Sequence, residues 1–168
     1  MTSYKPTKEE KERFMSRAIE LSDEGPSKGH GGPYGAVIVK DGKVIGEGYN
    51  REIIDNDPTG HGEMTAIRRA CQNIQSADLN GCEIYTSCEP CSMCTAAIRL
   101  CRLDHVYYGN RLADTRDCFD GELLVKYCST PIDERANTGS RSWARRLAPS
   151  IIKWANDPNL KLSLFQKY

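Results

Sequence analysis

A histidine, a glutamate and two cysteines stand at a spacing that suits metal chemistry. His61 and Glu63 flank Gly62, and further along the chain lies the run Pro90-Cys91-Ser92-Met93-Cys94. One imidazole and two thiolates suit zinc by their softness, and they leave the ion one open coordination position. Structural zinc is closed by four protein ligands, whereas catalytic zinc keeps a position for water. The pattern therefore predicts an enzyme with one zinc ion bound by His61, Cys91 and Cys94.

Glu63 is expected to stand apart from the ligand set. Side chains two residues apart on a regular helix point about 200° away from each other, so Glu63 is poorly placed to bind the ion that His61 binds. Zinc lowers the pKa of bound water to about 7, and a nearby carboxylate can carry the proton to a ring nitrogen and a leaving amine. H-x-E…P-C-x-x-C is the signature of zinc-dependent nucleobase deaminases. We therefore predict hydrolytic deamination, with Glu63 as the proton carrier.

Two other interpretations use the same cysteines. In the first, Cys88 is a third thiolate and His61 closes a structural zinc site. In the second, Cys91 and Cys94 are a thioredoxin-like redox pair. Pro90 and the preceding strand place Cys88 on the turn before a helix, and neither interpretation gives Glu63 a role. The number of ligands decides between a structural and a catalytic metal.

Composition limits the class of protein. A chain of 168 residues fits one domain over residues 1–168, and 23 basic side chains balance 23 acidic ones. This balance favours a small, weakly charged substrate over nucleic acid, although Arg141, Arg145, Arg146 and Lys153 form a basic cluster. The sequence shows neither an apolar signal region nor a membrane-spanning stretch, so we expect a cytoplasmic protein with reduced thiols. The other cysteines are expected to be small core residues: Cys71, Cys82, Cys101, Cys118 and Cys128.

Periodicity predicts alternating helices and strands. Thr7 and Glu10 form a capping box for a helix that ends at Gly25-Pro26, and a β-hairpin turns at Asp41-Gly42. Further elements follow in the order helix from residue 61, strand 84–87, helix 90–102 and strand 106–109. This order predicts a mixed sheet whose later strands are parallel, with both zinc-binding turns at helix N-termini. Residues 143–147 and 150–154 have a helical pattern, and 160–165 are a strand or a docked tail.

Several segments resemble one known family. They are Gly31 to Gly42, Asn56 to Thr59, His61 to Arg68 and Tyr85 to Cys91. On these segments the chain is similar to the cytidine-deaminase-like superfamily, and within it to bacterial guanine deaminases. The resemblance covers about residues 10 to 127 and resumes at Phe165-Gln166. It departs in Gly62, where those enzymes usually carry alanine, in Tyr34, where phenylalanine is usual, and in a longer basic stretch near residues 129–160.

The resemblance implies a fold, an assembly and a site. The fold is a three-layer α/β/α sandwich around a five-stranded mixed sheet, and the assembly is a homodimer. The resemblance places Asn50 where an asparagine hydrogen-bonds the base, Tyr34 where an aromatic ring stacks on it, and Asp114 at a substrate-side carboxylate. It further implies that the segment of about residues 155–168, with Phe165 and Tyr168, is exchanged between subunits to close the partner's site.

Guanine is therefore the expected substrate, hydrolysed to xanthine and ammonia. Two alternatives stay open on the sequence. The first is deamination of another amino-substituted ring, such as cytosine, adenine, a nucleoside or an aminotriazine. The second is a non-catalytic module, stabilised by zinc, that binds RNA or protein.

Overall fold

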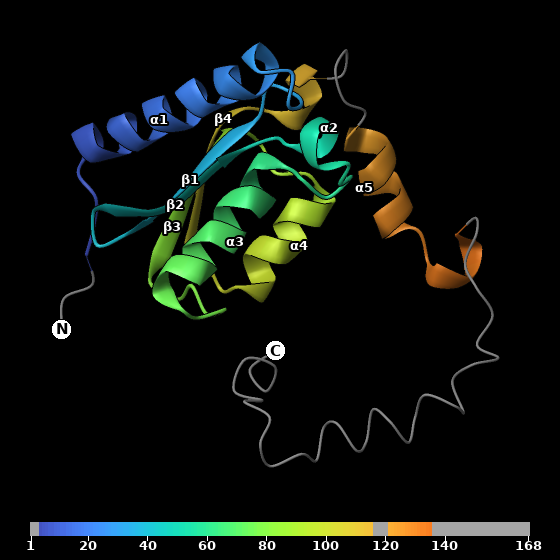
Figure 1. Cartoon of the computed structure of the whole chain (residues 1–168). Coiled ribbons are helices and arrows are strands. Elements are labelled where there is room, and N and C mark those ends of the chain that lie inside the picture. Colours follow the sequence, from blue (N-terminus) through green and yellow to red (C-terminus); the bar gives the residue numbers. More distant parts are fainter. Residues whose placement is uncertain (1–3, 116–120, 136–168) are drawn as a thin grey trace. The chain divides into compact units, whose positions relative to one another are not determined.

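The computed structural model describes residues 4–115 and 121–135 (Figure 1). Contacts divide the chain into two compact units, Met1–Lys126 and Tyr127–Tyr168. The single domain over residues 1–168 therefore stays a prediction. The described elements are α1 (Lys8–Ser27), β1 (Gly35–Lys40), β2 (Lys43–Tyr49), α2 (Glu52–Asp55), α3 (Gly62–Ile74), β3 (Cys82–Cys88), α4 (Ser92–Leu100), β4 (His105–Asn110), the 3-10 helix η1 (Leu112–Thr115), α5 (Gly121–Ser129) and the 3-10 helix η2 (Ile132–Glu134).

The first unit is built on a mixed sheet with strand order β2-β1-β3-β4. Strand β1 pairs antiparallel with both β2 and β3, whereas β3 and β4 are parallel. The predicted mixed sheet with parallel later strands is confirmed. Four strands lie among the described residues, so the fifth strand that the resemblance implied is not among them. The helical patterns predicted at 143–147 and 150–154, and the segment 160–165, lie outside the described residues.

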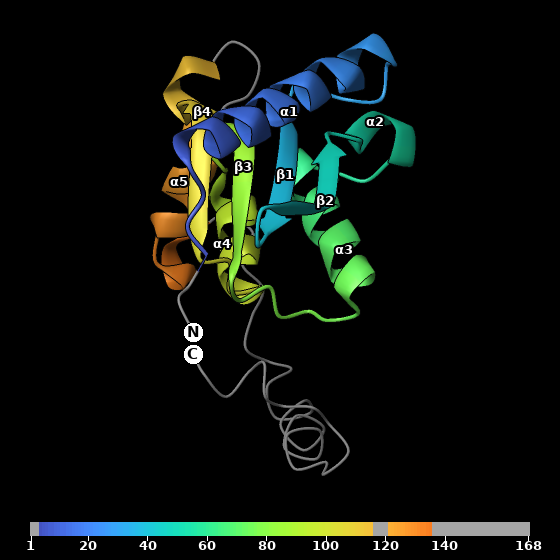
Figure 2. The same cartoon turned by 90° about the vertical axis from the view of Figure 1, so that its left-hand side faces the viewer.

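Helices cover both faces of this sheet (Figure 2). Helix α1 packs on one face over a core that includes Phe14, Val37 and Tyr85. Helices α3 and α4 lie on the other face, over a core that includes Ile38, Ala66 and Ile84. Adjacent strand residues point to opposite faces, so Val37 and Ile38 serve different cores. The three-layer α/β/α architecture is confirmed.

Local sequence signals explain most element ends. The capping box of α1 is present, since Thr7 and Glu10 exchange hydrogen bonds between side chain and backbone. Asp41 and Gly42 both have positive φ, 48° and 74°, as a two-residue type I′ hairpin turn requires. Helix α1 does not end at Gly25-Pro26 but continues to Ser27. Pro26 is tolerated one residue from the end because its φ is compatible with a helix, and its carbonyl accepts a hydrogen bond from Gly29 N–H at 2.9 Å.

The scattered cysteines only partly follow the expected pattern. Cys82 and Cys101 are buried as predicted, and Cys71 is half-buried. Cys128 is exposed, so its prediction as a core residue is wrong: apolar neighbours do not fix which side of a short helix faces inward. Cys118 lies outside the described residues. Within the second unit, the Arg135 guanidinium donates to the carbonyls of Thr130 and Cys128, each at 2.7 Å.

None of the helices in the described ranges combines the length and hydrophobicity that a membrane span needs.

Two glycines of β2 let α3 lie directly against the sheet. A Cβ added to Gly46 would stand 2.5 Å from the Ala66 carbonyl oxygen and 2.6 Å from the Ala70 amide nitrogen. One added to Gly48 would stand 2.7 Å from Thr65 Cβ. These contacts are with backbone or with the first side-chain atom, which cannot swing aside. The glycines therefore set the distance between the hairpin and the helix that begins at the site.

We predict that Gly46→Ala destabilises the fold by about 1–3 kcal/mol or more, because α3 must move away from β2 to admit the methyl group. The measurement is the free energy of unfolding from urea titration. Lys43→Ala on the same strand is the matched control and should change that free energy by less than about 0.5 kcal/mol. Equal stability of Gly46→Ala and wild type would show that the close approach is not required.

Candidate active site

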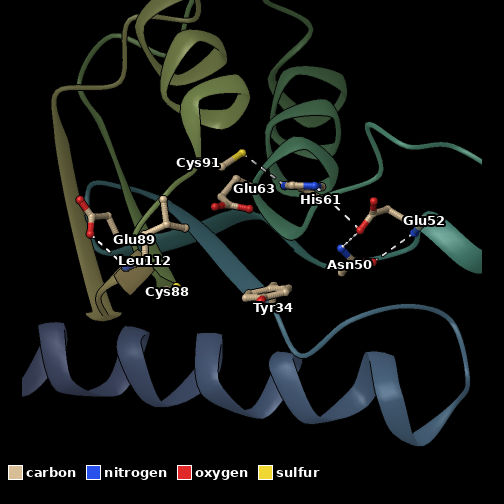
Figure 3. Close-up of a pocket in the computed structure, with 9 residues that line it drawn as sticks. All are labelled: Tyr34, Asn50, Glu52, His61, Glu63, Cys88, Glu89, Cys91 and Leu112. Carbon is tan, nitrogen blue, oxygen red and sulfur yellow. Dashed lines mark hydrogen bonds and ion pairs between the residues drawn. The ribbon is translucent and has the colours of Figure 1, made fainter. Parts of the chain in front are cut away.

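The N-termini of α3 and α4 meet at the site. His61 is the N-cap of α3 and Cys91 is the N-cap of α4, as predicted, and neither side chain caps its own helix. Both N-caps have extended backbone, so each side chain leaves the helix axis and remains available for other contacts. Cys94 lies three residues after Cys91 and therefore shares its face of α4. The sequence thus brings one imidazole and two thiols from two helices to one place (Figure 3).

The geometry of these three groups fits a zinc ion. His61 Nδ1 lies 3.6 Å from Cys91 Sγ and 3.5 Å from Cys94 Sγ. Zinc bonds of about 2.3 Å to sulfur and 2.0–2.1 Å to nitrogen, at tetrahedral angles, separate a nitrogen and a sulfur ligand by about 3.5–3.6 Å. His61, Cys91 and Cys94 are the one group of three potential ligands whose donor atoms come together in the described part of the chain. The donor set and its spacing both suit zinc.

A hydrogen bond couples the two thiols. A hydrogen bond from the Cys94 thiol, with another from His61, lowers the pKa of Cys91 to about 4. The same hydrogen bond raises the pKa of Cys94, and burial acts in the same direction. A metal ion binds thiolates, so metal binding displaces the thiol protons that remain.

Cys88 is close to the site but outside the ligand group. It is the last residue of β3 rather than part of the following turn, and it is buried. Its sulfur is not among the donor atoms that come together at His61. The closed structural zinc site with Cys88 as third thiolate therefore finds no support in the geometry. Three protein ligands leave the fourth position open, as catalytic zinc requires.

Glu63 is a buried carboxylate in the first turn of α3. Its side chain is only 6% exposed, and burial raises its pKa because the charged form loses hydration. It is absent from the group of metal donors but lines the same pocket as His61 and Cys91. A buried carboxyl group beside the metal ligands is placed to accept and donate protons, as general acid–base catalysis needs.

A pocket opens beside these residues, and its space of about 350 Å³ is continuous with solvent. Tyr34 and Asn50, the predicted base-contacting residues, both line it. Asp114 does not: it is exposed in η1, and its carboxylate accepts a hydrogen bond from the Arg111 backbone N–H at 2.9 Å. Its substrate role stays a prediction, as do the roles of Phe165 and Tyr168, which lie outside the described residues. The full lining is Tyr34, Asn50, Glu52, His61, Glu63, Cys88, Glu89, Cys91 and Leu112.

Sequence reasoning missed three lining residues. Glu52 lies on α2, a single turn of helix inside a segment that turn-forming residues dominate, and Leu112 lies on the short η1. Glu89 accepts a hydrogen bond from Leu112 N–H at 3.0 Å and so ties η1 to the end of β3. Glu89 stands inside the run Cys88-Glu89-Pro90-Cys91, which was the one available signal. Nothing in the local pattern singled out Glu52.

A three-ligand metal site with an adjacent buried carboxylate, between helix N-termini of an α/β/α sandwich, defines a zinc-dependent deaminase. The chain belongs to the family described as "Cytidine and deoxycytidylate deaminase zinc-binding region", which matches residues 8–110. This membership agrees with the fold and metal ligands expected from the sequence.

Individual members of this family differ in how similar they are to the chain. The guanine deaminase of Bacillus subtilis is 46% identical over 125 residues, which are 74% of this chain and 80% of that protein. A tRNA-specific adenosine deaminase of Haemophilus influenzae is 39% identical over 110 residues, covering 65% of this chain and 63% of the relative. The X-ray structure of guanine deaminase from Bacillus subtilis superposes with a TM-score of 0.83 at 42% identity, covering 89% of this chain and 96% of that one.

We predict that Cys91→Ser and Cys94→Ser lose zinc and that Cys88→Ser keeps one ion per chain, because only the first two sulfurs face His61 Nδ1. Metal content of the purified variants, measured by mass spectrometry after dialysis, checks this. Loss of zinc from Cys88→Ser with an intact fold would restore the four-ligand interpretation.

Proposed function

We propose that this chain hydrolyses guanine to xanthine and ammonia, with one zinc ion per subunit. The observation that carries the proposal is the meeting in one pocket of a three-ligand metal group and a separate buried carboxylate. The similarity to guanine deaminase from Bacillus subtilis over most of both chains supports the choice of base.

The chain's own residues have distinct roles in this reaction. His61, Cys91 and Cys94 would hold the zinc, which when bound supplies a Lewis acid and an activated water. Glu63 would take one proton from the water and pass it to a ring nitrogen, and would then carry the second proton, from the hydroxyl group added to the ring carbon, to the leaving amine. Tyr34 stacks on the base, and Asn50 hydrogen-bonds its edge. Burial raises the pKa of Glu63, which makes its carboxylate a stronger proton acceptor.

Wild-type protein should release ammonia from guanine faster than from cytosine, adenine, adenosine, an aminotriazine or tRNA at equal zinc loading. Glu63→Gln should lower kcat by at least about 10²-fold while zinc content is unchanged, since the amide cannot carry the proton. An ammonia-release assay across this panel measures both. A preference for tRNA or another base would refute the substrate, and full turnover by Glu63→Gln would refute the proton carrier.

We further propose that the active form is a cytoplasmic homodimer in which residues 155–168 cross to the partner, where Phe165 and Tyr168 close the pocket. An aromatic tail would exclude water and stack on a purine. In the described part of the chain, Leu100, Val106 and Tyr108 are apolar and exposed on α4 and β4, which supports an interface between subunits.

Complementation tests this exchange. If tails are swapped, a mixed dimer of a Glu63→Gln subunit and a Tyr168→Ala subunit contains one site with both an intact Glu63 and an intact tail. We expect such mixed dimers to recover up to about half of wild-type activity, although each parent homodimer is impaired. Light scattering establishes the dimer beforehand. Without exchange, every site in the mixture stays defective and no activity returns.

A further inference from the structure

Glu52, the first residue of α2, stands between the metal ligand His61 and the base-contacting Asn50 (Figure 3). We propose that Glu52 is a positioning residue for base selection: it holds the Asn50 carboxamide so that an N–H, and never the carbonyl oxygen, faces the substrate. The site would then take amino-substituted rings that present a hydrogen-bond acceptor to Asn50. This inference rests on the proposed deamination of a base.

Three partners fix the orientation of the Asn50 amide. The backbone N–H groups of Gly32 and Glu52 both donate to Asn50 Oδ1, at 3.1 and 3.2 Å. Asn50 Nδ2 donates to Glu52 Oε2 at 2.5 Å. Backbone N–H groups cannot accept and a carboxylate cannot donate, so the flipped amide would lose all three hydrogen bonds.

These three hydrogen bonds leave the Asn50 amide with one N–H that can bind a ligand. Both acceptor positions of Oδ1 are taken by backbone donors, and one of the two Nδ2 hydrogens is taken by Glu52. The second Nδ2 hydrogen remains, on a side chain that lines the pocket. Asn50 therefore offers the substrate a donor. Guanine, whose ring edges carry carbonyl and ring-nitrogen acceptors, satisfies this requirement.

Packing prevents Asn50 from turning. The residue is 1% exposed, and a Cβ added to Gly31 would lie 2.0 Å from Asn50 Oδ1 and 2.6 Å from its carbonyl oxygen. The backbone at Gly31 is therefore packed directly against the Asn50 amide. Sterics hold the position of the side chain, but they do not distinguish oxygen from nitrogen at its tip. That distinction comes from the hydrogen bonds, and Glu52 supplies the only acceptor among the three partners.

Glu52 also faces the metal side of the site. Its Oε2 lies 3.8 Å from His61 Nε2, while His61 Nδ1 faces the two sulfurs. Histidines that bind metals through one nitrogen are commonly oriented by a carboxylate at the other. Because one carboxylate oxygen stands near both groups, the test must separate an effect on zinc from an effect on base binding.

The test compares two substitutions of matched length. Glu52→Met removes the acceptor, and Glu52→Gln retains an acceptor oxygen without the charge. At equal zinc content, we expect Glu52→Met to raise KM for guanine about 10-fold or more and Glu52→Gln to stay within about 3-fold of wild type. Asp55→Asn, in the same helix but paired with Arg51 rather than with a pocket residue, is the control and should leave both kcat and KM unchanged. Thermal unfolding confirms that each variant is folded.

A double-mutant cycle checks that Glu52 acts through Asn50. In an Asn50→Ala background, Glu52→Met should change KM by less than about 2-fold, because the group it positions is gone. An unchanged KM for Glu52→Met, equal impairment of Glu52→Gln and Glu52→Met, or additive effects in the cycle would each overturn the inference. So would a loss of zinc from Glu52→Met with normal KM at the remaining loaded sites.

Failure of the proposed substrate gives a different result. If wild type deaminates another base and not guanine, the choice of guanine is wrong, and the same comparison is made with the base that is accepted. A wild type inactive on every base would overturn the proposed function and this inference together.

Discussion

The site depends on holding three soft donors from two helices at one point. Neither α3 nor α4 carries the whole metal group, so its 3.5 and 3.6 Å nitrogen–sulfur distances are set by how both helices pack on the sheet. Gly46 and Gly48 fix α3 against β2, and the parallel strands β3 and β4, joined through α4, fix the other helix. Zinc tolerates only a few tenths of an ångström in such distances. Backbone contact across the sheet is therefore a requirement of the chemistry.

Close backbone contact is also required at Gly62, which lies against Tyr34, a residue that lines the pocket. A Cβ at this position would lie 2.8 Å from the Tyr34 carbonyl oxygen, so the backbone before β1 reaches α3 more closely than an alanine would permit. Bacterial guanine deaminases, which this chain resembles, usually carry alanine there and phenylalanine in place of Tyr34. The two departures are thus in contact in the structure. Because the contacts are with the backbone of Tyr34 and Gly35, replacing Gly62 requires that this backbone segment shift.

Features that a local motif marks could be predicted from the sequence, whereas features that depend on tertiary contacts could not. His61, Cys91 and Cys94 were predictable because ligand chemistry and helix starts both mark them, and Asp41-Gly42 because its turn demands positive φ. The continuation of α1 past Pro26 to Ser27 was not predictable, since tertiary contacts decide whether a last helical turn forms. Glu52 was hidden because its contacts with Asn50 and His61 form only in the folded chain, and no motif marks it locally. The four described strands follow from periodicity, whereas the fifth rested only on resemblance.

Charge in the pocket narrows the substrates that the geometry admits. Three carboxyl groups line it, those of Glu52, Glu63 and Glu89. Neither lysine nor arginine is among the lining residues that the structure describes. Such a cavity stabilises a bound cation and repels a phosphate, so an anionic nucleotide meets an unfavourable field close to the metal. A neutral base escapes this repulsion, and its acceptor edge finds the one donor that Glu52 has left on Asn50.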